Sequence, residues 1–84
     1  MWSQLQDTAL RISVRQRIEH GRLPVVPPKQ ICAGYGSGHL CAVCDQPITS
    51  AQAEYVAQDY ASGRQLQFHA ACLAVWQVEC ARRA

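Results

Sequence analysis

The chain has 84 residues and a formal net charge of +2, which predicts a single domain (1–84) whose core alone contributes only a few kcal/mol. Binding one divalent ion through three deprotonated thiols would bring that charge to +1, so the strongly basic class of nucleic-acid-binding proteins is excluded. No apolar run approaches the roughly 20 residues of a membrane span, and no membrane association is expected.

The cysteine content points to metal rather than to disulfides. The chain has five cysteines, an odd number that full disulfide pairing would not use up. The first nine residues include Ser3, Gln4, Gln6 and Asp7 where a secretory segment would need an apolar run. We therefore expect a cytoplasmic protein, in which such cysteines are more often metal ligands.

Residues 1–21 form the first segment, a predicted helix from about Gln4 to His20. Gly21, with Pro24 beyond it, is typical of a helix end. Two apolar stripes run along the helix: Trp2, Leu5, Ala9 and Ile12 on one side, and Leu10, Val14 and Ile18 on the other. A helix that is apolar on two sides either packs between two layers or is shared with a partner, including a second copy of the chain.

Residues 22–40 are a Pro/Gly-rich connection and are predicted to be irregular. The run from Leu23 to Pro28 contains three prolines, which exclude a helix and favour a stiff extended strap. The glycines of Gly34–Gly38 suggest a phosphate-binding loop, but such a loop follows a strand and precedes a helix. Neither is predicted here, so a flexible lead-in to the cysteines that follow is favoured.

Residues 41–84 change in character and carry the remaining predicted elements. Asp45–Pro47 has turn chemistry, and residues 54–60 and 64–68 are predicted to be two strands joined by 61–63. Leu66 and Phe68 alternate with glutamines, which predicts that one face of this strand is buried and the other is exposed to solvent. From Ala70 to about Arg83 the period becomes helical, with one shared face formed by Leu73, Trp76 and Cys80.

Two pairs of soft ligands bracket the predicted hairpin. Cys41 and Cys44 are separated by two residues, His69 and Cys72 are separated by two residues, and 24 residues lie between the pairs. A Cys-x-x-Cys turn can place both sulfurs on one ion, and a His-x-x-Cys pair in the first turn of a helix can complete the shell. Three thiolates and one imidazole form the closed tetrahedral set that structural zinc prefers. We predict one Zn²⁺ per chain.

Three other soft side chains compete for these positions. His39 as a ligand would leave an awkwardly short spacing to Cys41. Cys32 is expected to be a small buried apolar residue. Cys80 lies two turns beyond Cys72 on the predicted helix, about 12 Å along its axis.

The order of knuckle, hairpin and helix resembles a treble-clef zinc finger of the LIM-like and RING-like group. The resemblance covers residues 41 to about 80 and implies a small zinc-stabilised α+β fold in which Trp76 packs the helix on the hairpin. The chain lacks a second interleaved ligand set, so ubiquitin-ligase chemistry is not implied. The run Arg17–Pro24, the Gly-x-Gly-Ser-Gly stretch and both ligand pairs together are similar to a family of small bacterial proteins, a resemblance that implies a fold but no particular function.

Two function classes follow, neither of them enzymatic. Four protein ligands leave a metal no open position for water, which disfavours catalysis. The first hypothesis is a protein-interaction adaptor in which zinc holds a small rigid platform. The alternative is a nucleic-acid-binding finger whose phosphate contacts come from arginines in or beside the first helix: Arg11, Arg15, Arg17 and Arg22.

Overall fold

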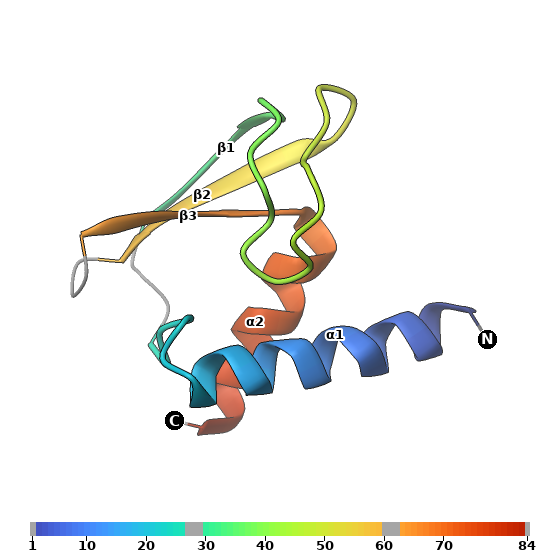
Figure 1. Ribbon diagram of the computed structural model, residues 1–84, viewed down its shortest axis with the longest axis vertical. Helices are drawn as coiled ribbons and strands as arrows, with labels where there is room; N and C mark the ends of the chain where they lie inside the picture. Colours follow the sequence, from blue (N-terminus) through green and yellow to red (C-terminus); the bar gives the residue numbers. More distant parts are fainter. Residues whose placement is uncertain (1, 27–29, 60–62, 84) are drawn as a thin grey trace.

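The fold is a three-stranded antiparallel sheet with two helices packed in succession on one face (Figure 1). The computed structural model describes residues 2–26, 30–59 and 63–83; the side chains of residues 2–7 lie outside this description. The elements are α1 (Trp2–Glu19), β1 (Ile31–Tyr35), β2 (Ala53–Asp59), β3 (Arg64–Phe68) and α2 (Ala70–Arg83). This small α+β architecture agrees with the predicted class.

Helix α1 ends where the sequence predicts. Gly21 has a φ of 73°, and its N–H donates to the Ile18 carbonyl at 3.1 Å while the Arg22 N–H donates to the Arg17 carbonyl at 2.7 Å. These two bonds satisfy carbonyls that the helix end leaves unpaired, in the Schellman arrangement that favours glycine. The helix end therefore turns the chain sharply toward buried Leu23.

Among the described side chains of α1, those of one predicted apolar stripe are buried and those of the other are exposed. Val14 and Ile18 belong to the core and Leu10 packs against it, and α1 lies against α2. On the other stripe, Ile12 is 49% exposed and Ala9 is exposed; Trp2 and Leu5 fall among the side chains that are not described. The helix is thus the outer layer of the fold and not the middle of a sandwich.

The prediction that all of residues 22–40 are irregular is wrong, because Ile31–Tyr35 forms β1. The strand pairs antiparallel with β2, from Ile31 opposite Ala57 to Tyr35 opposite Ala53. Four of its five residues are exposed, so no alternation of apolar and polar residues marks it. Backbone pairing to a neighbouring strand forms this edge strand, and a hydrophobic pattern cannot predict it.

Strands β2 and β3 form the predicted hairpin, with Tyr55 opposite Phe68 and Asp59 opposite Arg64. Leu66 and Phe68 are buried, as their alternation predicts. The predicted strand residue Tyr60 and the connecting residues 61 and 62 lie outside the described part of the chain.

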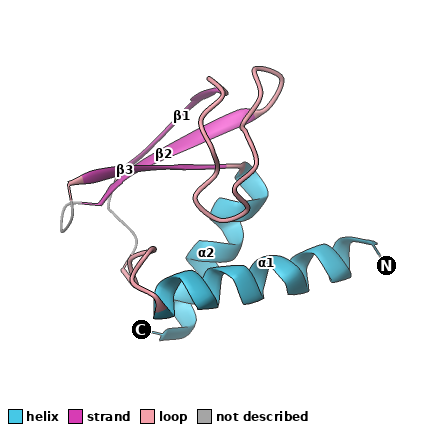
Figure 2. Ribbon diagram, viewed as in Figure 1, coloured by secondary structure: helices cyan, strands magenta, loops and turns pink. Residues whose placement is uncertain are grey.

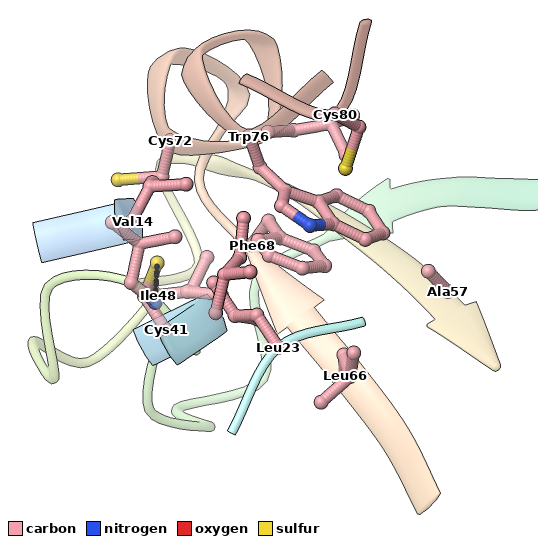
Figure 3. Close-up of a cluster of buried hydrophobic side chains, with 13 residues drawn as sticks. Val14, Leu23, Cys41, Ile48, Ala57, Leu66, Phe68, Cys72, Trp76 and Cys80 are labelled. Atoms are coloured by element: carbon pink, nitrogen blue, oxygen red, sulfur yellow. Dashed lines mark hydrogen bonds between the residues drawn. The ribbon is translucent and has the colours of Figure 1, made fainter. Parts of the chain in front are cut away.

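The core gathers where α2 crosses the sheet. Helix α2 packs against β2 and β3, and Trp76 stacks on Phe68 with ring centroids 4.8 Å apart (Figure 3). The indole N–H of Trp76 donates to the Pro24 carbonyl at 3.0 Å, so the buried ring keeps a hydrogen-bond partner. Trp76 therefore joins the helix both to the hairpin, as expected, and to the start of the proline strap. Of that strap, residues 27 and 28 are not described.

Candidate metal centre

The long connection between β1 and β2 descends to the first turns of α2 and returns to the sheet (Figure 2). At its far end a tight turn carries the first ligand pair. The Cys41 N–H donates to the Gln46 carbonyl at 2.9 Å and the Asp45 N–H to the Cys41 carbonyl at 3.1 Å. Asp45 has a φ of 60°, a left-handed conformation that aspartate tolerates. The turn leaves Cys41 and Cys44 on the same side.

One backbone amide also points toward the sulfur of Cys41. The Val43 N–H lies 3.5 Å from Cys41 Sγ, the acceptor, a contact that favours a thiolate. Val43 is fully buried, as is Ile48 just after the turn. Apolar packing thus helps to fix the turn in place.

The second pair comes from the junction of β3 with α2. His69 follows the last residue of β3, and Cys72 lies in the first turn of α2, where the Leu73 N–H donates to the His69 carbonyl at 2.9 Å. The Ala42 N–H donates to the Gln67 carbonyl at 2.8 Å. This bond fastens the knuckle to β3 and brings the two pairs face to face.

The four predicted ligand residues meet in one place. Their ligand atoms all lie within 4.8 Å of one another, and Cys44 Sγ is 3.4 Å from His69 Nδ1. A tetrahedral zinc site has Zn–S bonds of about 2.3 Å and Zn–N bonds of about 2.0 Å, which place two sulfurs about 3.8 Å apart and a sulfur and nitrogen about 3.6 Å apart. Four Cys and His side chains are therefore positioned to hold a metal ion.

The pKa values of the three thiols are shifted because the thiols lie so close together. Hydrogen bonding to Cys72 lowers the pKa of Cys41 despite its burial, and the same bond raises the pKa of Cys72. Burial raises the pKa of Cys44. Thiols this close share protons when no cation is present, whereas a divalent cation would let all three ionise.

The other soft side chains lie elsewhere. Cys80 is buried, with its Sγ 3.7 Å from the Pro24 carbonyl, and its sulfur lies beyond Trp76 from those of Cys41 and Cys72 (Figure 3). The expectation that Cys32 is buried is wrong: it is exposed on edge strand β1, where the sheet leaves its side chain uncovered.

His39 takes part in a polar cluster that the sequence does not reveal. Its Nδ1 lies 2.6 Å from Ser37 Oγ and 3.5 Å from a carboxylate oxygen of Glu54. Ser37 Oγ also donates to Glu54, at 3.2 Å, which satisfies a carboxylate that is only 7% exposed. Glu54 stands in a strand far along the chain, so only the fold brings the three together. His39 orders the lead-in to the knuckle.

The Gly34–Gly38 stretch begins within the end of β1, and it is not a nest of free amides. The Gly36 N–H donates to the Gln52 carbonyl and the Gly38 N–H to the Ile48 carbonyl, each at 2.9 Å. A Cβ at Gly36 would overlap the Thr49 carbonyl oxygen. The glycines let two backbone segments lie close together, which gives the phosphate-loop interpretation no support.

Two of the four arginines named for nucleic acid are engaged within the chain. Arg15 Nε lies 3.0 Å from a carboxylate oxygen of buried Glu79 on α2, and Arg17 Nη2 lies 2.6 Å from Asp45 Oδ2 in the knuckle. Arg11 and Arg22 are exposed. The ion pairs give Arg15 and Arg17 a role in holding α1 against the rest of the fold.

Comparison with known proteins adds no relative: no family model matches the chain, and neither the curated proteins nor the solved structures give a match. The candidate metal centre is therefore argued from its own side chains. Within the described residues, no helix combines the length and the apolar character needed to cross a membrane.

Proposed function

We propose that Cys41, Cys44, His69 and Cys72 bind one structural Zn²⁺ per chain. The observation that carries the proposal is the convergence of four ligand atoms within 4.8 Å from two separate elements. Thiolate and imidazole donors in tetrahedral geometry favour zinc over the harder cations. The sequence of knuckle, hairpin and helix supports a treble-clef arrangement around it.

The ion's role is structural rather than catalytic. Four protein ligands complete a tetrahedral shell, whereas a catalytic zinc keeps a position for water or substrate. Cys41 and Cys72 are almost completely buried, which further restricts access. A cytoplasmic location suits the proposal because a reducing compartment keeps the ligand thiols available.

The platform that zinc holds serves as a protein-interaction adaptor. Large apolar side chains remain exposed after the α1 cap, at the end of β1 and just before the knuckle: Val26 is 77%, Tyr35 88% and Leu40 59% exposed. Exposed aromatic and aliphatic groups on a rigid support are what protein interfaces use as contact points. For nucleic acid, the pairing of Arg15 and Arg17 with carboxylates removes much of the charge on which that alternative depends.

Zinc content tests the metal proposal. Protein purified from zinc-replete cells should contain one equivalent of zinc by elemental analysis, and Cys72→Ala should contain none. Two equivalents, or none in the unmodified chain, would overturn the assignment.

The adaptor role is tested separately with a photo-crosslinking amino acid at exposed Tyr35. Irradiation in cells should give a discrete adduct with protein, dependent on an intact metal centre. Adducts with nucleic acid instead would reject the adaptor.

A further inference from the structure

One edge of the sheet is left open by the described part of the chain. The strand order is β1-β2-β3, so the sheet ends at β1 on one side and at β3 on the other (Figure 1). At the β3 edge, the Ala42 N–H donates to the Gln67 carbonyl at 2.8 Å, so the knuckle occupies that side. At the β1 edge, no further strand of the described residues pairs with Ile31–Tyr35. The sheet can therefore be extended at β1.

The backbone groups of β1 alternate between its two sides. The Gly36 N–H, one residue beyond the strand, donates to the Gln52 carbonyl at 2.9 Å and so faces β2. In an antiparallel pair, each residue directs its N–H and C=O to the same side, and the side alternates along the strand. Cys32 and Gly34 therefore face β2, as Gly36 does. The other three residues direct both groups to the open side: Ile31, Ala33 and Tyr35.

Strand β1 lacks the features that usually protect an exposed edge. Such edges are commonly protected by charged side chains, by proline or by a β-bulge. The sequence of β1 contains neither a charge nor a proline. Its one-to-one register with β2, from Ile31 opposite Ala57 to Tyr35 opposite Ala53, leaves no bulge. Four of its five residues are exposed, so the strand offers accessible donors and acceptors to another strand.

A second copy of the same strand fits this edge in one register. About a two-fold axis at Ala33, the strand meets itself in antiparallel orientation. Because the backbone groups of Ala33 point outward, the two copies would exchange both hydrogen bonds there. The same register places Tyr35 opposite Ile31 of the second copy, and an aromatic residue with a β-branched one makes a favourable cross-strand pair.

Gly34 gives an independent reason to expect a second backbone here. The fold of one chain does not require glycine at this position, since its φ is not positive and nothing lies within 4 Å of a Cβ. Glycine inside a strand weakens it and is typical of positions where another backbone approaches closely. In the register centred on Ala33, Gly34 lies opposite Cys32 of the second copy and leaves space beside its side chain.

Charge also favours a second copy over a segment of another protein. Pairing of β1 with itself brings no like charges together. An uncharged strand has nothing with which to select a charged segment from elsewhere.

We propose that two copies of the chain pair through β1, antiparallel and centred on Ala33, so that their sheets become one continuous sheet. An edge of five residues buries little area, so the dimer is weak, with a Kd on the order of 0.1 mM. The proposal goes beyond the adaptor role and is tested on the purified chain alone. A photo-adduct between two copies at Tyr35 has the mass of two chains, which distinguishes it from an adduct with a partner protein.

Amide exchange in the isotope-labelled full chain, as purified, tests the pairing. Between about 20 μM and about 1 mM, exchange should slow about fourfold at the amides of Ile31, Ala33 and Tyr35, because the monomer fraction falls by about that factor. The amides of Cys32 and Gly34, already bonded to β2, should change little. Sedimentation velocity should show the dimer over the same range. A monomer at about 1 mM, or equal changes at all five amides, would overturn the proposal.

Proline at the centre of β1 removes one outward donor from each copy. Ala33→Pro deletes the N–H that would bond across the axis but no bond to β2, and an edge strand tolerates proline where its N–H faces solvent. The dimer should weaken at least tenfold, whereas Ala33→Val, which keeps the N–H, should change the Kd less than threefold. Near-ultraviolet circular dichroism checks that both variants are folded. Equal Kd values for the two folded variants would contradict the pairing.

A charge swap at Ala33 identifies both the occupant and the register. Ala33→Lys and Ala33→Asp should each be monomeric at about 1 mM, because like charges would meet at the axis. An equimolar mixture should dimerise again, since each introduced ammonium then faces an introduced carboxylate. If the mixture stays monomeric while the unmodified chain dimerises, the register centred on Ala33 is rejected. If the unmodified chain is monomeric and β1 instead binds an extended peptide of another protein, the second copy is rejected.

Discussion

At the scale of single residues, the five cysteines divide by environment. Cys41, Cys44 and Cys72 converge with His69, Cys80 is buried with its sulfur near the Pro24 carbonyl, and Cys32 is exposed on β1. Burial raises the pKa of the Cys80 thiol, which keeps it protonated and unreactive. Exposure and metal ligation therefore predict very different reactivity for chemically identical side chains.

Thiol titration measures this division. In zinc-loaded protein, Cys32 alone should react rapidly with an aromatic disulfide reagent, and the other four should become reactive after chelation, because a metal-bound or buried thiol is protected. Cys32→Ser should remove the fast reaction and retain one zinc. Three or more fast thiols in loaded protein would show that a proposed ligand is not bound, because Cys32 and Cys80 account for at most two.

Substitution of the two cysteines outside the ligand set, Cys32 and Cys80, should change the free energy of unfolding by different amounts. Cys80→Ser should lose about 1–3 kcal/mol, since it places a hydroxyl in a packed site, while Cys32→Ser should stay within about 0.5 kcal/mol. Both should retain zinc. Denaturant unfolding with zinc analysis provides the measurement, and loss of metal in either variant would mean that the ligand set is different.

At the scale of elements, the lead-in to the knuckle depends on one glycine. Gly36 has the carbonyls of Ile48 and Thr49 where a side chain would begin, whereas nothing lies within 4 Å of a Cβ at Gly34. Gly36→Ala must push two backbone segments apart and should cost about 1–3 kcal/mol. Gly34→Ala, two residues earlier, is the matched control.

Thermal unfolding of the two glycine variants tests whether the close approach at Gly36 stabilises the fold. Gly36→Ala should lower the Tm by several degrees, and Gly34→Ala should leave it nearly unchanged or raise it, because alanine restricts the unfolded chain. A similar Tm for both would mean that the close approach of the two segments is not important for stability.

The elements differ in how far sequence predicts them. Helix α1, the hairpin and α2 follow from local signals: the cap at Gly21, the alternation at Leu66 and Phe68, and the helical period around Trp76. Strand β1 has no such signal, because its pairing with β2 is a long-range backbone contact and its side chains are exposed. The ligand residues are predictable from spacing, since a Cys-x-x-Cys turn defines its own geometry. The cluster of Ser37, His39 and Glu54 and the ion pairs of Arg15 and Arg17 join residues distant in sequence, which no local pattern specifies.

At the scale of the whole molecule, the candidate metal centre links the sheet to both helices. The knuckle is fastened to β3, α2 begins inside the ligand set, and α1 is fixed to the knuckle through Arg17 and to α2 through Arg15. Zinc sites of this kind contribute an apparent 10–16 kcal/mol near pH 7, comparable to the stability of an entire domain. Removal of zinc should therefore unfold the sheet and α2 together, and leave α1 at most marginally helical.

Both chelation and acid should remove the metal ion and unfold the protein in a single transition. Loaded ligands are held deprotonated, so their pKa values lie below those of the unfolded chain; the stability they confer is present at neutral pH and is lost as the pH falls, below about 6. In a metal-free fold the three thiols do not share one direction: hydrogen bonding to Cys72 lowers the pKa of Cys41, whose contribution declines in acid, whereas the pKa values of Cys44 and Cys72 are raised and their contribution declines in alkali. Near-ultraviolet dichroism reports the stacked Trp76, measured in a Trp2→Phe background so that one indole gives the signal. If that signal stays native after zinc has left, the apolar core alone holds the fold, and the metal centre must be explained by binding or regulation rather than by stability.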